Sequence, residues 1–191
     1  MIPNSFVIFP GVRHSIEKQI WETGITDWCD ASAALLKQWI SWSDLDACRI
    51  ALEERDARHF NDALLGSDRW RLYQDFIDEA AFLDIETTGL SPGDSVVTMV
   101  GVLDRGGFTA YTRGKNLGEL PEAISKNKLI VTFNGTSFDL PFVRHEFEAT
   151  GQADLFDHAA HLDLRYVMRR AGYTGGLKRI EQTLGVGRKT A

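Results

Sequence analysis

Two acidic residues in one short segment have the spacing that metal-dependent chemistry needs. The segment Phe82–Ser91 has the sequence FLDIETTGLS, and Asp84 and Glu86 stand two positions apart in what we predict to be a β-strand. Side chains two apart on a strand point to the same face, while Leu83 and Ile85 point the other way, into a core. Adjacent carboxylates repel each other, and a divalent cation that prefers oxygen ligands relieves this repulsion. The spacing therefore suggests a site for such an ion.

The same two acids also fit a solvent-facing strand that has no site, because a short D-x-E pattern often occurs by chance. The residues that follow, Thr87, Thr88 and Gly89, favour a site. Their hydroxyl groups and a tight turn would let a phosphate or a sugar come close to the end of the strand.

A second stretch, Val131–Phe142, has the sequence VTFNGTSFDLPF. It predicts a buried strand that runs into a turn at Asn134, with a positive φ angle. Asp139 then begins a helix, with Pro141 in the first turn. Taken alone, Asp139 is equally well explained as a helix N-cap that contributes about 1 kcal/mol, and Asn134 as a residue that only forms the turn.

Together, the two stretches resemble the first and second motifs of the DEDD superfamily of metal-dependent 3′–5′ exonucleases, and the YprB-like branch in particular. The resemblance covers roughly residues 81–188 and implies a ribonuclease H-like fold. It implies catalysis by two Mg²⁺ or Mn²⁺ ions, which clamp the attacking and leaving oxygens, acting on a single-stranded 3′ end of DNA or RNA. It also implies that the catalytic and metal-binding residues are Asp84, Glu86 and Asp139, and that the substrate-binding residues are Thr87, Thr88, Leu90, Asn134 and Phe138.

The third motif of that superfamily is an Asp on a late helix, preceded by a His or Tyr that acts as general base. His158 and Asp163 have one of the expected spacings, but they follow Asp139 closely and fall on a predicted strand. Asp163 is therefore either an additional catalytic acid or a strand-end residue that caps the next helix. With the third motif missing before Ala191, we expect either a truncated nuclease domain or a weak or inactive site.

The predicted elements place both motifs in an α/β fold. Tight turns between the first three strands predict an antiparallel meander, and helical crossovers predict parallel neighbours after it. The result is a mixed five-stranded sheet flanked by helices. The predicted strands are 81–85, 95–103, 108–112, 129–133 and 161–164, and the helices are 119–126, 139–150, 165–171 and 177–184.

Composition changes near Ala80, which divides the chain into a helical region, 1–80, and a nuclease domain, 81–191. Helices are predicted before this boundary over 15–23, 32–42 and 43–59, with a shorter piece over 70–77. Residues 10–25 resemble a helix-hairpin-helix DNA-binding element, and a plain packing helix is the alternative.

The chain carries 21 Lys and Arg against 27 Asp and Glu, a formal net charge of −6. This balance excludes a protein that coats nucleic acid by net charge alone. Residues 1–80 hold 8 basic and 14 acidic residues, whereas residues 164–191 hold 7 basic residues and one acid. The basic segment could attract phosphates or form a solvated helix face.

No apolar run reaches the roughly 18 residues of a membrane span, and no signal peptide pattern begins the chain. Cys29 and Cys48 are too few for a disulfide framework or a zinc site. We therefore expect a cytoplasmic protein. Two alternatives to an exonuclease remain: a nucleic-acid-binding module that has lost catalysis and uses residues 164–191, and a structure-specific endonuclease on the same fold.

Overall fold

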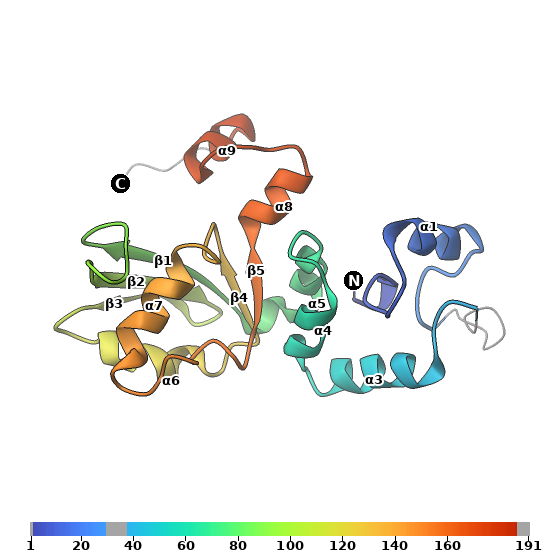
Figure 1. Ribbon diagram of the computed structural model, residues 1–191, viewed down its shortest axis with the longest axis horizontal. Coiled ribbons are helices and arrows are strands. Elements are labelled where there is room, and N and C mark those ends of the chain that lie inside the picture. The colour runs from blue at the N-terminus through green and yellow to red at the C-terminus, as the bar shows by residue number, and fades with distance from the viewer. Residues whose placement is uncertain (1, 30–37, 187–191) are drawn as a thin grey trace.

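The computed structural model describes residues 2–29 and 38–186 (Figure 1). At its centre is a five-stranded sheet with the order β3-β2-β1-β4-β5. The strands are β1 (Ala80–Thr87), β2 (Val97–Asp104), β3 (Gly107–Thr112), β4 (Leu129–Thr132) and β5 (Ala160–Asp163). β1, β2 and β3 pair antiparallel, while β4 pairs parallel with both β1 and β5. The predicted α/β fold with a mixed five-stranded sheet is confirmed.

One face of the sheet is covered by the two helices that connect its strands (Figure 1). These are α6 (Leu120–Ile124), preceded by the 3-10 turn η4 (Leu117–Glu119), and α7 (Asp139–Glu148). Leu83 and Ile85 of β1 are buried in the same cluster as Phe142 and Val143 of α7. The alternation predicted for β1 thus places its apolar residues against α7 and its acids on the opposite face.

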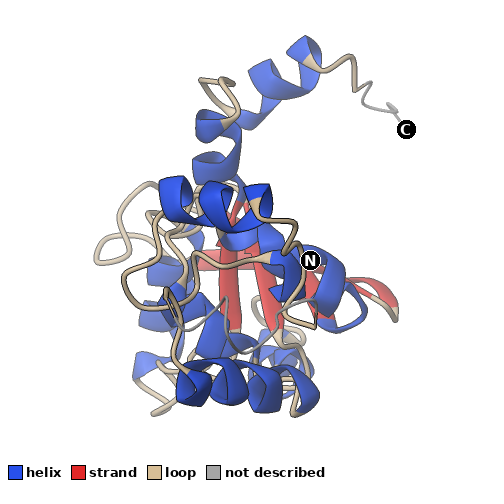
Figure 2. Ribbon diagram, turned by 90° about the vertical axis from the view of Figure 1, so that its right-hand side faces the viewer, coloured by secondary structure: helices blue, strands red, loops and turns tan. Residues whose placement is uncertain are grey.

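The other face is partly covered by the residues that precede the sheet. Figure 2 shows these helices in front of the strands. They are η1 (Ile2–Asn4), α1 (His14–Glu22), α3 (Trp42–Glu53), α4 (Ala57–Ala63), η2 (Arg69–Leu72), α5 (Tyr73–Phe76) and η3 (Ile77–Glu79). Trp28 and Phe60 share one buried cluster with Val131 of β4 and Leu162 of β5. The N-terminal region and the sheet therefore have a common core.

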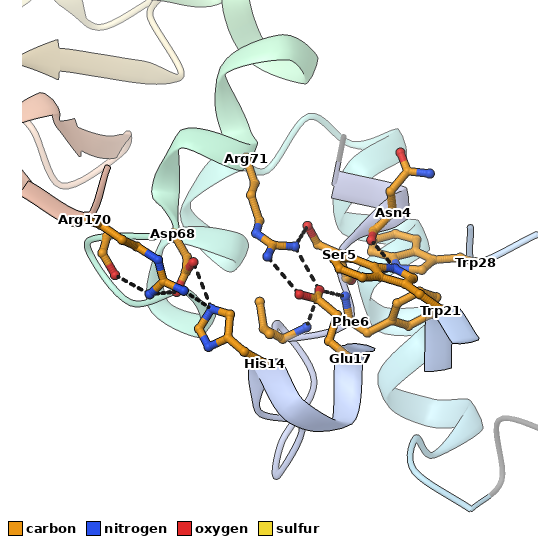
Figure 3. Close-up of polar contacts among 12 residues, drawn as sticks. Asn4, Ser5, Phe6, His14, Glu17, Trp21, Trp28, Asp68, Arg71 and Arg170 are labelled. Carbon is orange, nitrogen blue, oxygen red and sulfur yellow. Dashed lines mark hydrogen bonds and ion pairs between the residues drawn. The ribbon is translucent and has the colours of Figure 1, made fainter. Parts of the chain in front are cut away.

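Two polar clusters hold the N-terminal region in place, one around Glu17 and Arg71 and the other around Asp68 and His14 (Figure 3). In the first, the buried Glu17 of α1 accepts hydrogen bonds from both terminal nitrogens of Arg71, each at 2.8 Å. Its Oε1 also accepts from the backbone N–H groups of Phe6, at 2.7 Å, and Val7, at 3.2 Å. Arg71 donates a further hydrogen bond to Ser5 Oγ. The ion pair thus joins α1 to η2 and to the chain before α1.

Three sequence predictions in this region need correction. The predicted helix 43–59 is two helices, because Arg55 between them adopts a positive φ of 58° and Asp56 begins α4 by accepting a hydrogen bond from the His59 N–H. Of the predicted helix 32–42, residues 32–37 lie outside the described part, and residues 38–41 are not helical.

The third correction concerns residues 10–25, where the structure has a single α-helix, α1, after a turn. Residues 2–9 contribute only η1, so no helix-hairpin-helix is formed over these described residues. Glu17 and Ile20 of α1 are buried, so this helix packs within the N-terminal region. The packing helix, the alternative reading, fits this arrangement.

The last two helices extend beyond the sheet. α8 (Leu164–Arg170) leaves the end of β5 directly, and α9 (Leu177–Thr183) lies beyond it (Figure 1). Across residues 2–29 and 38–186, the structure contains no helix with the length and hydropathy that a bilayer crossing requires.

Candidate active site

The two motif stretches meet at one edge of the sheet. β1, β4 and β5 run parallel, so their carboxyl ends lie side by side, which is where sites form in sheets of this kind. The first motif ends β1, the second connects β4 to α7, and Asp163 ends β5. The fold therefore brings together the segments that the sequence analysis singled out.

Asp84 and Glu86 are both exposed on the same face of β1. The residues between and before them, Leu83 and Ile85, are only 4% and 7% exposed. This confirms the alternation expected from the sequence. Neither carboxylate makes a hydrogen bond or an ion pair with any residue in the described part of the chain. Both are consequently available to a ligand.

An apolar cavity of about 400 Å³ lies over this face of the sheet and is lined by both carboxylates. Phe82, Leu103 and Phe108 contribute to its walls. A Cβ atom on Gly101 would lie 3.2 Å from the Phe108 ring, so the absence of a side chain at position 101 leaves room for that ring. The acids thus stand beside an apolar wall that a base or a sugar could contact.

Asp139, the first residue of α7, is only 3% exposed. Burial raises the pKa of its carboxyl to about 6, and the charges of Asp84 and Asp163 add to this effect. Backbone hydrogen bonds from Asp139 itself and from Ile85 lower that pKa in part. Among the described residues, the charges that shift the pKa of this carboxyl are those of other acids. An added cation would therefore stabilise its ionised form.

Asp163 has a different environment. Its Oδ1 accepts hydrogen bonds from the N–H groups of Asn134, at 2.8 Å, and Arg165, at 3.0 Å, and its Oδ2 accepts from Thr136 N–H at 3.1 Å. The capping alternative is confirmed, because Asp163 is the N-cap of α8. Its part as an additional catalytic acid stays a prediction. His158 contacts the carbonyls of Ile124 and Asn127 instead.

Three of the predicted substrate-binding residues lie where β1 ends: Thr87 is its last residue, and Thr88 and Leu90 are in the loop that follows. Thr87 Oγ1 donates to the Gly89 carbonyl at 2.6 Å, and Thr88 Oγ1 accepts from Val96 N–H at 3.0 Å. Both hydroxyls therefore shape the loop. The side chain of Leu90 is 88% exposed, which leaves it open to contact from a ligand.

The other two predicted substrate-binding residues lie in the loop between β4 and α7. Asn134 has a φ of 70°, as the turn prediction required, and its Oδ1 accepts a hydrogen bond from Arg165. Phe138 is half-buried, with its ring centroid 4.8 Å from that of Phe142. The sequence analysis did not assign Arg165 to the site. The one signal that included it was the excess of basic residues over 164–191.

The chemistry of the available donors fits a hard divalent ion. Asp84, Glu86 and Asp139 offer only oxygen atoms, which suit Mg²⁺ or Mn²⁺ better than zinc. Over residues 2–29 and 38–186, however, no three His, Cys, Asp or Glu side chains are gathered closely enough to hold a metal ion as they stand. The three carboxylates are thus the right kind of ligand for such an ion, but their side chains do not converge on one point in this structure.

The family model of the RNase H superfamily matches residues 81–191, more than half of the chain. The chain belongs to the RNase H superfamily. Nucleases with the RNase H-like fold generally use divalent metal ions. No curated protein matches the sequence significantly.

Two solved structures resemble this RNase H superfamily chain. The family B DNA polymerase from the archaeon Pyrobaculum calidifontis is 17% identical, with a TM-score of 0.44, and the match covers 57% of this chain and 18% of the polymerase. Brucella melitensis NrnC bound to pGG is 19% identical, with a TM-score of 0.42, and the match covers 62% of this chain and 59% of NrnC. The chain thus spans less than two thirds of either protein.

Proposed function

We propose that this protein is a metal-dependent 3′–5′ exonuclease that hydrolyses phosphodiester bonds of DNA or RNA. The observation that carries the proposal is the pair of exposed, unpartnered carboxylates of Asp84 and Glu86 at the edge where the buried Asp139 begins α7. In a member of the RNase H superfamily, this arrangement supports cleavage of a nucleic-acid strand better than binding alone.

In this proposal each acid has a distinct part. Asp84 and Glu86 extend from a rigid strand into the cavity that a substrate can enter, so they would ligate the ions that also contact the phosphate. Asp139 is held at the start of α7 with most of its surface buried, so it would anchor an ion from the protein side. Two Mg²⁺ or Mn²⁺ ions bound there would supply an activated water and stabilise the leaving oxygen.

The residues around the acids would position the terminal nucleotide. Leu90 presents an exposed apolar side chain, and Phe138 presents an aromatic ring supported by Phe142. Aromatic and apolar side chains hold bases without reading their sequence. Thr87 and Thr88 maintain the loop that carries Leu90.

The test uses 5′-labelled single-stranded DNA and RNA with Mn²⁺. We expect shortening from the 3′ end, which stops when EDTA is added. Asp84→Asn keeps the shape of the side chain and removes its charge. Loss of a residue that only hydrogen-bonds to a metal ligand lowers activity by roughly 10- to 100-fold. Because Asp84 is proposed to ligate the ion directly, Asp84→Asn should lower the rate by more than that.

The matched control is Glu122→Gln, which removes an exposed acid on α6 and should leave the rate unchanged. Degradation that persists in EDTA or in Asp84→Asn would show the assignment to be wrong. Cleavage of a circular strand would instead indicate an endonuclease. Binding without any degradation would indicate a module that has lost catalysis.

A further inference from the structure

A second cavity, of about 710 Å³, adjoins the carboxylate site. Its walls come from the loop after β4, from α8 and from the segment that leads into α9. Phe133 lines both this cavity and the one over the carboxylates, so the two spaces border the same residue. A chain molecule bound at the acids could therefore continue into the second cavity.

Arg165 and Arg169 both line this second cavity from α8. They are four residues apart, so they lie on the same face of the helix. Among the described residues, the Arg165 guanidinium has one hydrogen-bond partner, the amide oxygen of Asn134. Within the described residues, no carboxylate pairs with either arginine. The cavity thus contains two positive charges that no described carboxylate neutralises.

The adjacent face of α8 contacts the N-terminal region, and these contacts fix the rotation of the helix about its axis. Arg170 lies 3.7 Å from Asp68 Oδ2 and 2.9 Å from His14 Nε2, while His14 Nε2 lies 3.1 Å from Asp68 Oδ1 (Figure 3). A Cβ atom at Gly66 would lie 3.6 Å from the Tyr166 ring. With Tyr166 and Arg170 held on that side, positions 165 and 169 face the cavity.

Tyr173, which is half-buried, adds an aromatic ring to the same cavity. One arginine guanidinium can donate two parallel hydrogen bonds to the oxygens of a phosphate. Aromatic rings stack on bases of any sequence. The volume lies within the roughly 300–1,000 Å³ of typical small-molecule sites. It therefore suits one or two nucleotides of a single strand.

We propose that the cavity between α8 and α9 binds the single-stranded nucleic acid next to the nucleotides at the carboxylates, with Arg165 and Arg169 on its phosphates and Tyr173 on a base. This inference rests on the proposed function for the location of the strand end. It goes further by assigning a second binding site for the single strand.

The test measures binding of a fluorescently labelled oligothymidylate in EDTA, where the proposed metal-dependent cleavage does not occur. Arg165→Gln/Arg169→Gln should weaken binding by at least about tenfold. It should also reduce the slope of log affinity against log salt by about 1.4, since each phosphate contact to a single strand contributes about 0.7. Tyr173→Ala should weaken binding, and Tyr173→Phe should restore it.

The charge-matched control is Arg58→Gln/Arg105→Gln. Arg58 is exposed on α4, and Arg105 is an exposed residue of the turn between β2 and β3, at the opposite end of β2 from the carboxylates. This variant should bind within about twofold of wild type. Thermal unfolding of every variant checks that the fold is kept.

The inference is overturned if Arg165→Gln/Arg169→Gln binds like its control, or if wild type does not bind the strand. Equally tight arginine-dependent binding of a duplex overturns the choice of a single strand. Degradation with Mn²⁺ is measured separately. Binding that needs the arginines without degradation defeats the proposed function alone, whereas Asp84-dependent degradation with arginine-independent binding defeats this inference alone.

Discussion

Gly135 shows how tightly the loop of the second motif is built. A Cβ atom at this position would lie 2.2 Å from Oγ1 and 2.5 Å from Cβ of Thr132. The Gly135 N–H also donates to Thr132 Oγ1 at 3.1 Å. The next residues lead directly to Asp139, so the position of that acid depends on the absence of a side chain at 135.

Gly135→Ala should lower the free energy of unfolding by about 1–3 kcal/mol, because the added methyl group forces Thr132 or the loop to move. Urea unfolding at neutral pH measures this change. Gly118→Ala is the control, since a Cβ atom at Gly118 meets nothing within 4 Å. Equal stability of the two variants would contradict the steric explanation.

The two cysteines differ in environment. Cys48 is buried, and burial, together with the charge of Asp44, raises the pKa of its thiol from 9.0 to about 11. Cys29 is exposed. Because the thiolate is the reactive form, Cys48 should resist alkylation at pH 8.

Iodoacetamide at pH 8 should therefore label Cys29 and leave Cys48 unmodified in the native protein, as peptide mass spectrometry would show. The raised pKa means that the folded protein keeps a proton that the unfolded chain releases between pH 9 and about 11. The contribution of Cys48 to stability should consequently fall as the pH rises through that window. Comparable labelling of both cysteines at pH 8 would disprove this view.

At the scale of elements, Glu17 joins α1 to η2 and to the chain before α1. Its carboxylate is 1% exposed, and the Arg71 side chain that pairs with it is 10% exposed. The rings of Trp21 and Trp70 lie 6.0 and 5.4 Å from the Arg71 guanidinium carbon. Removing the acid leaves a buried charge and two backbone N–H groups without their acceptor.

Glu17→Ala should therefore destabilise the protein by about 3–5 kcal/mol, the usual cost of removing one partner of a buried ion pair. The control, Glu22→Ala, removes an acid that is 63% exposed and lies 3.7 Å from Lys18. It should cost no more than about 1 kcal/mol. Thermal and urea unfolding compare the two, and similar midpoints would show that the ion pair does not hold α1.

The whole molecule has a core that crosses the boundary near Ala80. Leu162 of β5 belongs to the same buried cluster as Trp28 and Phe60 of the N-terminal region. Side chains packed in one cluster lose their contacts together when either part unfolds. The N-terminal region and the sheet should therefore unfold in one cooperative transition.

Leu162→Ala tests this coupling and should cost about 2–5 kcal/mol. All five tryptophans precede residue 80, so their fluorescence reports on the N-terminal region, whereas the substitution lies in the sheet. The fluorescence and circular dichroism midpoints should shift together. Thr109→Ala, on the exposed strand β3, is the control. A fluorescence midpoint that stays in place would indicate two independent units.

Much of the fold could be predicted because its signals are local. The period-two alternation around Asp84 and the turn residues between β2 and β3 depend only on neighbours in the sequence. Strand directions followed from connection lengths, since short turns join antiparallel strands and helical crossovers join parallel ones. The break at Arg55 was missed, because Glu79, distant in sequence, binds that side chain.

The sequence by itself determined the sheet, the face on which Asp84 and Glu86 lie, and the turn at Asn134. These follow from side-chain period and from backbone preferences that each segment carries alone. Only the tertiary structure decided that Asp163 accepts hydrogen bonds from the second motif, that Arg165 and Arg169 line a cavity, and that the N-terminal region shares the core. Each of these depends on burial and on partners brought together by folding, which no local pattern records.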